Sequence, residues 1–153
     1  MIRKAGNEDL EALVAANCAM AWETEHVRLD PAVLRRGVGR ILEECVPGTY
    51  WVYEDAGRVV AQLLITYEWS DWRDAMVWWI QSVYVQPEYR RRGLYAQLYR
   101  HVEAAARNAG AAGLRLYVDS SNVPAQDVYS ALGMNGGHYR VFEAMFSEPP
   151  REA

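Results

Sequence analysis

The chain has 153 residues, of which 51% are hydrophobic and 24% are charged. This balance is typical of a soluble globular protein, and it excludes disordered, collagen-like and coiled-coil classes. The net charge of −4 argues against a nucleic-acid binder, which normally presents a basic face. No stretch reaches the roughly 18 uncharged residues of a membrane helix. Cys18 and Cys45 form no CxxC pair, which favours a reducing compartment. We therefore expect one cytoplasmic domain with no membrane or nucleic-acid partner.

The first half of the chain predicts a strand, two helices and an antiparallel meander. A strand over residues 2–5 is followed by a helix with Asn7 as its N-cap, running to about Trp22. Asp30 and Pro31 start a second helix, because Asp caps well and Pro is favoured at the first helical position. Short turns then separate three β-branched and aromatic runs, which predicts a meander. The expected strands cover residues 49–54, 59–69 and 76–85.

The second half alternates helices and strands. Apolar residues at helical spacing predict a helix from Leu94 to about Ala109, which ends at Gly110. Three further elements and a flexible tail are then expected, in the order strand 114–119, helix 124–132, strand 139–146 and tail 147–153. The predicted fold class is α/β: one domain over residues 1–146, with a mixed, mostly antiparallel sheet flanked by about four helices.

A cluster of three arginines stands where the strand 76–85 gives way to the helix that starts near Leu94. Arg90, Arg91 and Arg92 precede Gly93 in a chain that is acidic overall. Free backbone N–H groups at a helix N-terminus bind anions, and a glycine lets a phosphate approach the backbone closely. No Gly-Lys-Ser/Thr follows and two Rossmann glycines are missing, so neither a P-loop nor a dinucleotide fingerprint is present. The pattern indicates one localised anionic ligand, although a solvated charge run is the plain alternative.

A second motif follows in Asn122-Val-Pro-Ala-Gln-Asp-Val-Tyr129-Ser-Ala-Leu-Gly133-Met134. Taken alone, Asn122 fits a helix N-cap and Tyr129 a packing aromatic. Together with Arg90-x-x-Gly93-x-Tyr95, however, the motif resembles the paired signatures of the GNAT superfamily of N-acetyltransferases. The resemblance covers nearly the whole chain. The runs Tyr67–Arg73 and Trp78–Val85 are similar to a bacterial branch of that superfamily.

The resemblance implies acetyl-CoA as the co-substrate and assigns roles to residues of both motifs. The arginine–glycine loop is expected to wrap the pyrophosphate, and the preceding strand to pair its backbone with pantetheine and act as the oxyanion donor. Tyr129 is expected to protonate the departing thiolate as the general acid. The residues assigned to cofactor binding are Val83, Tyr84, Val85, Arg90, Arg91, Arg92, Gly93, Leu94, Tyr95, Ala96 and Asn122.

The general base does not follow from the resemblance. Tyr95 replaces the usual second Gly or Ala, and Tyr117 stands where some family members carry a glutamate base. Glu68 and Asp71 are therefore the candidate bases, and solvated surface carboxylates are the alternative for each. The acidic residues of these connections also suggest a cleft for a cationic amine; they are Glu23, Glu25, Glu68, Asp71 and Asp74. The three histidines lack metal-ligand spacing, so no metal is expected.

The sequence as a whole favours an N-acetyltransferase that moves acetyl from acetyl-CoA to a primary amine by direct attack in a ternary complex. A small cationic or aromatic acceptor is expected. Two alternatives remain open: a non-catalytic acyl-CoA-binding sensor or structural subunit, and a transferase for a longer acyl group. The resemblance also implies a possible homodimer.

Overall fold

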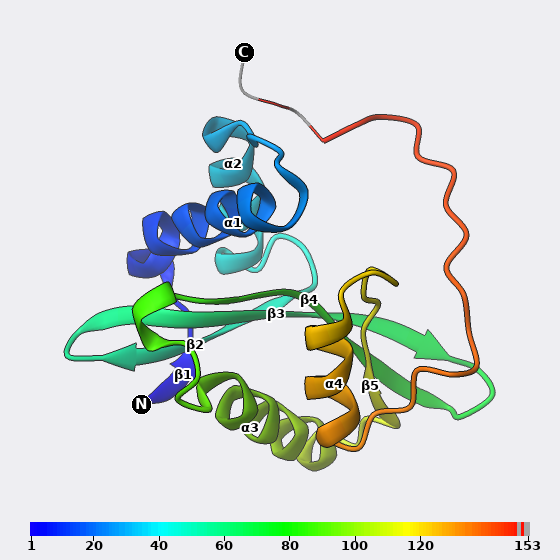
Figure 1. Ribbon diagram of the computed structural model, residues 1–153. Coiled ribbons are helices and arrows are strands. Elements are labelled where there is room, and N and C mark those ends of the chain that lie inside the picture. The colour runs from blue at the N-terminus through cyan, green and yellow to red at the C-terminus, as the bar shows by residue number, and fades with distance from the viewer. Residues whose placement is uncertain (150, 152–153) are drawn as a thin grey trace. The chain divides into compact units, whose positions relative to one another are not determined.

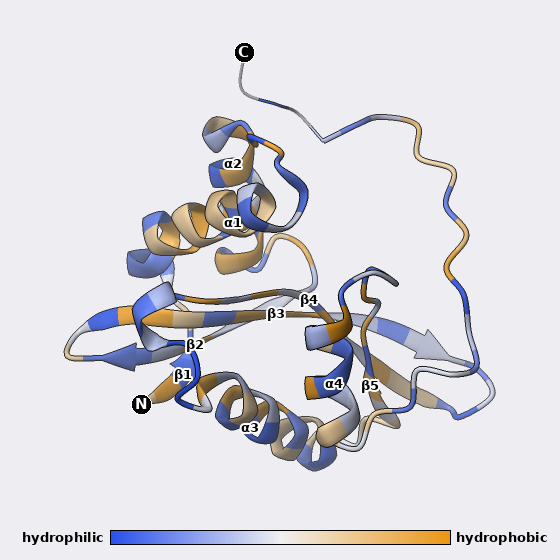
Figure 2. Ribbon diagram, viewed as in Figure 1, coloured by the Kyte–Doolittle hydropathy of each residue, from blue (hydrophilic) through white to orange (hydrophobic). Residues whose placement is uncertain are grey.

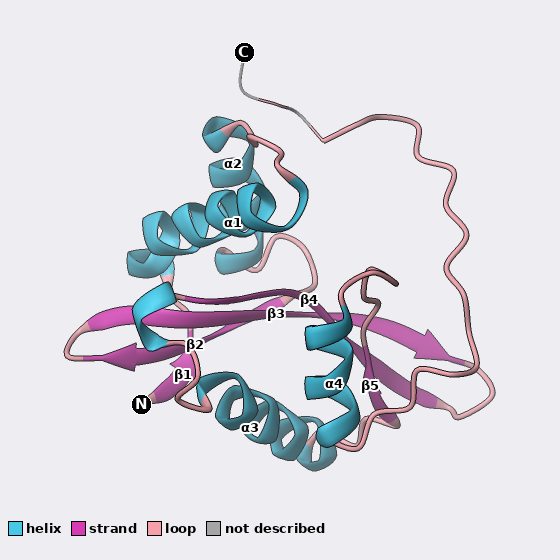
Figure 3. Cartoon of the chain, in the orientation of Figure 1, coloured by secondary structure: helices cyan, strands magenta, loops and turns pink. Residues whose placement is uncertain are grey.

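Five strands in the order β1-β2-β3-β4-β5 form one mixed sheet in the computed structural model of the chain. The first four strands pair antiparallel, and β5 lies parallel to β4. This confirms the predicted mixed, mostly antiparallel sheet and the meander in its middle (Figure 3). The strands are β1 (Ile2–Lys4), β2 (Thr49–Asp55), β3 (Arg58–Ser70), β4 (Ala75–Val85) and β5 (Gly113–Arg115).

The structure describes residues 1–149 and 151. The described residues divide into two compact units, residues 1–115 with 149 and 151, and Leu116–Glu148, and each is described by itself. The first unit holds the whole sheet and three α-helices, and the second holds one. Within the described residues, no helix is long and apolar enough to cross a bilayer.

Helices cover both faces of the sheet in the first unit (Figure 1). One face carries α1 (Leu10–Glu25) and α2 (Pro31–Leu42), and the other carries α3 (Leu94–Asn108). Alternation along the strands supplies both cores, because successive side chains point to opposite faces. Tyr50 and Val52 of β2 pack on the side of α1 and α2. Trp51, between them, stacks edge-on against His101 of α3, with ring centroids 5.0 Å apart.

The helix starts partly follow the sequence prediction. Asp30 caps α2 as expected, since its side chain accepts a hydrogen bond from the Ala32 N–H at 2.8 Å. The prediction of Asn7 as an N-cap is wrong. Residues Asn7–Asp9 form a 3₁₀ turn, η1, and Gly6 is its N-cap. The Gly6 N–H donates a hydrogen bond to Asp9 Oδ2 at 2.9 Å. The capping carboxylate comes from Asp9, inside the turn. Composition alone does not distinguish this arrangement from one in which Asn7 is the N-cap.

The second unit contains α4 (Val123–Ala131), which matches the predicted helix. The strand predicted over residues 139–146 is absent, and these residues run as an extended loop (Figure 3). We call this segment the apolar arm, because its large apolar side chains are exposed, Phe142 by 93% and Phe146 by 102%. Figure 2 shows apolar stretches interrupted by polar residues along this loop. The aromatic and apolar composition of the segment favoured a strand, but a strand also requires a hydrogen-bonded neighbour.

Candidate functional site

The connection between β4 and α3 forms a loop with two residues in left-handed conformation. A 3₁₀ turn, η2 (Pro87–Tyr89), is followed by Arg91 at φ +60° and Gly93 at φ +72°. Gly93 is the N-cap of α3 and makes no side-chain cap, and the first backbone bond of the helix runs from Gln97 N–H to Gly93 O. A Cβ placed on Gly93 would meet nothing within 4 Å, so open space lies in front of the loop.

The loop therefore has the properties of an anion site. The first N–H groups of an α-helix have no acceptor within the helix, and they lie at the positive end of its dipole. In α3 these groups belong to Leu94, Tyr95 and Ala96. Left-handed residues next to right-handed ones turn successive N–H groups toward one point, which favours a phosphate.

The strand that leads into this loop has one edge available for a ligand. β4 pairs with β5 over Val77–Trp79 only, whereas its pairing with β3 continues to Val85. The β3–β4 register shifts between Leu63 and Ile65: Leu63 faces Val83, whereas Ile65 faces Ile80. Among the described strands, none pairs with the second edge of β4 from Ile80 to Val85, so its backbone groups suit an extended ligand chain.

The first arginine of the cluster has protein acceptors for its guanidinium, although its side chain is 43% exposed. Arg90 Nε donates to the backbone oxygen of Val85 at 2.9 Å, and Nη2 donates to Glu23 Oε2 at 2.6 Å. Arg91 and Arg92 are exposed, and the Arg92 guanidinium lies 5.0 Å from the ring centre of Tyr89. Arg91 and Arg92 are therefore the two members of the cluster that are placed to meet an anionic ligand.

Glu23, near the end of α1, joins this arrangement from the other side. Its Oε1 accepts a hydrogen bond from the Tyr84 hydroxyl at 2.8 Å. Burial raises the pKa of the Glu23 carboxyl, but the bonds from Arg90 and Tyr84 outweigh it and hold the pKa below its usual value. The pKa of Tyr84 is raised by burial and by the bond to Glu23. Glu23 is thus ionised at neutral pH, and Tyr84 keeps its proton.

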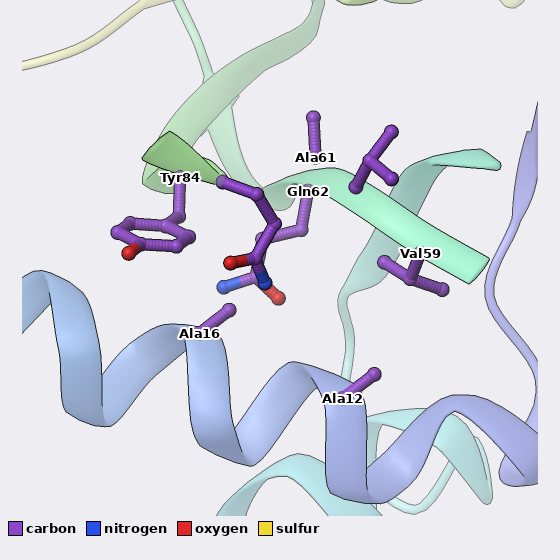
Figure 4. A pocket seen from close by; sticks show the side chains of 8 residues that line it. Ala12, Ala16, Val59, Ala61, Gln62 and Tyr84 are labelled. Atoms are coloured by element: carbon purple, nitrogen blue, oxygen red, sulfur yellow. The ribbon is translucent and has the colours of Figure 1, made fainter. Parts of the chain in front are cut away.

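A small cavity lies between α1 and the sheet, next to Tyr84. Figure 4 shows Gln62 and Tyr84 from the sheet facing Ala12 and Ala16 of α1. Gln62 is 1% exposed and lies opposite Tyr84 in the β3–β4 register, and neither polar atom of its amide has a hydrogen-bond partner among the described residues. The small alanine side chains leave this space open.

The second unit carries Asn122 and Tyr129. Asn122 is the N-cap of α4, and its side-chain oxygen accepts from the Ala125 N–H at 3.2 Å. Tyr129 lies seven residues on, which places it near the same helix face two turns later. It is half-buried, and this burial raises the pKa of its hydroxyl. A phenol with a raised pKa stays protonated at neutral pH, as a general acid must.

The two candidate bases lie away from the loop. Glu68 Oε1 is paired with Arg115 at 2.6 Å, and its Oε2 accepts from Trp79 Nε1 at 3.0 Å. Glu68 faces Val77 in the register, six residues before Val83, or about 20 Å along the strand. Asp71 lies beyond it, in the exposed turn after Ser70. The structure therefore does not bring Glu68 or Asp71 together with Val83–Val85.

The structure does bring the arginine loop together with the end of β4, through the bond from Arg90 to Val85. The contact of Glu23 with Tyr84 and Arg90 was not found from the sequence, since it joins residues 61 and 67 positions apart. Among the described residues, no three His, Cys, Asp or Glu side chains are placed to hold a metal ion.

Comparisons with known proteins match the chain to one family. Residues 20–134 match the model of the acetyltransferase (GNAT) family. A thialysine N-epsilon-acetyltransferase of Bos taurus is 35% identical over 75 residues, which cover 49% of this chain and 44% of that protein. The chain thus aligns with less than half the length of this curated relative.

Solved structures resemble the chain over nearly its full length. A possible acetyltransferase from Clostridium difficile 630 is 39% identical, with a TM-score of 0.89, and the match covers 97% of this chain and 98% of that one. The aminoglycoside N-acetyltransferase AAC(6')-Iy in complex with CoA is 18% identical, with a TM-score of 0.79 over 96% and 95% of the two chains. At that identity the likeness concerns the fold alone.

Proposed function

The chain belongs to the acetyltransferase (GNAT) family, and from this premise we propose that it is an N-acetyltransferase that moves an acetyl group from acetyl-CoA to a primary amine. The observation that carries the proposal is the loop after β4: two left-handed residues, a side-chain-free N-cap and exposed arginines at the start of α3. A non-catalytic acyl-CoA-binding protein would use the same loop, so catalysis needs its own test.

The described residues fit acetyl-CoA in shape and charge. The N–H groups of Leu94, Tyr95 and Ala96 suit the pyrophosphate, and the open space at Gly93 admits it. Arg91 and Arg92 supply positive charge in a chain with a net charge of −4. The second edge of β4, near Val83, suits the pantetheine arm, because its backbone groups can pair with an extended amide chain.

In the proposed mechanism, acetyl-CoA supplies an activated thioester and the protein positions it. A backbone N–H of Val83–Val85 stabilises the oxygen of the acetyl group, where negative charge develops. From the family resemblance of their motif, Asn122 is proposed to contact the cofactor, and Tyr129 to give its hydroxyl proton to the leaving sulfur. We do not assign the general base to Glu68 or Asp71, given the distance along β4.

The proposed acceptor is a small amine with a second positive charge or an aromatic group. The exposed acidic side chains of the β3–β4 turn, Asp71 and Asp74, support this acceptor, because they attract cations. A relative points the same way, since its name refers to thialysine. Screening by salt should weaken the attraction.

Thermal shift and turnover assays test the proposal together. Acetyl-CoA at about 100 times its Kd should stabilise the protein by roughly 2.7 kcal/mol. Gly93→Glu should abolish this shift, because it places a carboxylate at the phosphates. Gly110→Glu is the matched control: Gly110 has φ +74° and open space, and it lies at the other end of α3.

An amine panel, scored by release of free CoA, then separates an enzyme from a sensor. Turnover with a cationic amine supports the proposal. Binding of acetyl-CoA with no transfer to any amine would favour the sensor, and no thermal shift in the wild-type protein would remove the basis of both.

A further inference from the structure

Glu23 makes long-range contacts that the acetyl-transfer reaction, as described above, does not use. It comes from α1, yet it binds Tyr84 of β4 at 2.8 Å and Arg90 of the loop at 2.6 Å. Each carboxylate oxygen therefore has a donor. The end of α1 and the stretch that leads from β4 into the loop, more than 60 residues apart in the sequence, meet at this one side chain.

Arg90 has a geometry that depends on both of its acceptors. Its Nε is bonded to the Val85 carbonyl, its Nη2 to Glu23, and its Cζ lies 5.4 Å from the centre of the Tyr84 ring. A planar guanidinium can satisfy two acceptors in fixed directions, which a lysine ammonium cannot do in the same way. The arginine is thus bound to the last residue of β4 and to α1 at once.

The contact gives little stability but a defined geometry. The side chains of Arg90 and Glu23 are 43% and 38% exposed, and ion pairs this open to solvent contribute little to folding. Arg90 directly precedes Arg91 and lies three residues before Gly93, and these two are the left-handed residues of the loop. Fixing Arg90 therefore fixes where the loop leaves β4, and loop order before binding improves affinity.

We propose that Glu23 is a positioning residue for the cofactor loop, acting through Arg90. Glu23 holds the Arg90 guanidinium against the carbonyl of Val85 and so keeps residues 90–96 in the shape that receives the pyrophosphate. In this arrangement Arg90 is neutralised, and Arg91 and Arg92 supply the charge for the phosphates. The inference rests on the proposed function, since it assumes that acetyl-CoA binds at this loop.

A calorimetric titration with CoA as the probe tests the inference. Glu23→Gln keeps the shape of the side chain and removes its charge. We expect the Kd for CoA to rise about tenfold, as ordering of the loop is lost. With acetyl-CoA, KM should rise similarly and kcat should stay unchanged. Glu25→Gln is the matched control, because Glu25 is exposed on the last turn of the same helix.

A double-mutant cycle shows whether Glu23 acts through Arg90. Arg90→Gln should weaken CoA binding, and adding Glu23→Gln to it should then have no further effect. Circular dichroism and melting temperature confirm that each variant is folded. Equal CoA affinity in Glu23→Gln and Glu25→Gln would overturn the inference, as would full additivity of the two substitutions. Failure of the wild-type protein to bind CoA would instead contradict the proposed function.

Discussion

Asp9→Asn is expected to destabilise the fold markedly, because Asp9 is a buried carboxylate in an ion-pair network that joins three elements. It is 5% exposed, and Arg3 binds both of its oxygens, at 2.7 and 3.0 Å. The Gly6 N–H donates to the same carboxylate at 2.9 Å. Arg3 also binds Glu54 of β2, so the network connects β1, η1 and β2.

The size of the effect follows from burial. Removing one partner of a buried ion pair costs about 3–5 kcal/mol. In the variant Arg3 still pairs with Glu54, and the Arg3 side chain is 28% exposed, so the Arg3 charge retains a partner and contact with solvent. We therefore expect a loss of about 2–3 kcal/mol, which corresponds to about 4–12 °C in Tm for a domain of this size. Glu8→Gln is the control, because Glu8 is exposed and lies 4.0 Å from Arg3.

The pH dependence of this difference checks its cause. Bonds from Arg3 hold the pKa of Asp9 below its usual value, with a smaller contribution from Gly6. A lowered folded-state pKa gives stability above the unfolded value, about 3.9, and that stability is lost as pH falls through the folded pKa. Urea unfolding should therefore show a constant difference between wild type and Asp9→Asn near neutral pH, and a smaller one in acid. A loss below about 1 kcal/mol at neutral pH, or a difference that grows in acid, would refute the reasoning.

Three further outcomes are expected. Tyr129→Phe should lower kcat by about 10²-fold with little change in CoA affinity; a wild-type rate would leave Tyr129 a packing role. Glu68→Gln combined with Asp71→Asn should raise KM for a cationic acceptor and leave kcat unchanged, because both residues lie away from Val83; loss of the acidic limb of the kcat–pH profile would instead make one of them the base. Gln62→Met should stabilise the protein by about 1 kcal/mol in urea unfolding, because a buried amide without partners is removed; destabilisation would contradict its being unsatisfied.

Local patterns in the sequence predicted most of the sheet and its helices. Periodicity and turn residues act over short distances, so the meander from Thr49 to Val85 and the cap at Asp30 could be predicted correctly. The loop at Gly93 was found for the same reason, since its glycine and its following helix are contiguous. Its role with acetyl-CoA stays a prediction, as do the tail boundary at residue 147, the cytoplasmic location and the bacterial branch.

Contacts between distant segments could not be predicted in the same way. Arg90 was expected at the phosphates with its neighbours, but its partner Glu23 lies 67 residues away and no local pattern marks it. Glu68 was considered as a base because carboxylates are candidate bases by type. Its pairing with Arg115 and its position along β4 depend on the strand register. The predicted strand over 139–146 fails for a related reason, because strand pairing requires a neighbour that local composition does not specify.

The exposed apolar arm also affects how strongly molecules of the protein associate with one another in solution. Its large apolar side chains face water over eight consecutive residues; they are Tyr139, Val141, Phe142, Met145 and Phe146. The net charge of −4 opposes close approach of molecules at low ionic strength. Added salt screens this repulsion, and sulfate further strengthens apolar association. Concentrated solutions should therefore scatter more light as the ammonium sulfate concentration rises. The substitutions Phe142→Asp and Phe146→Asp should raise the salt concentration at which scattering begins.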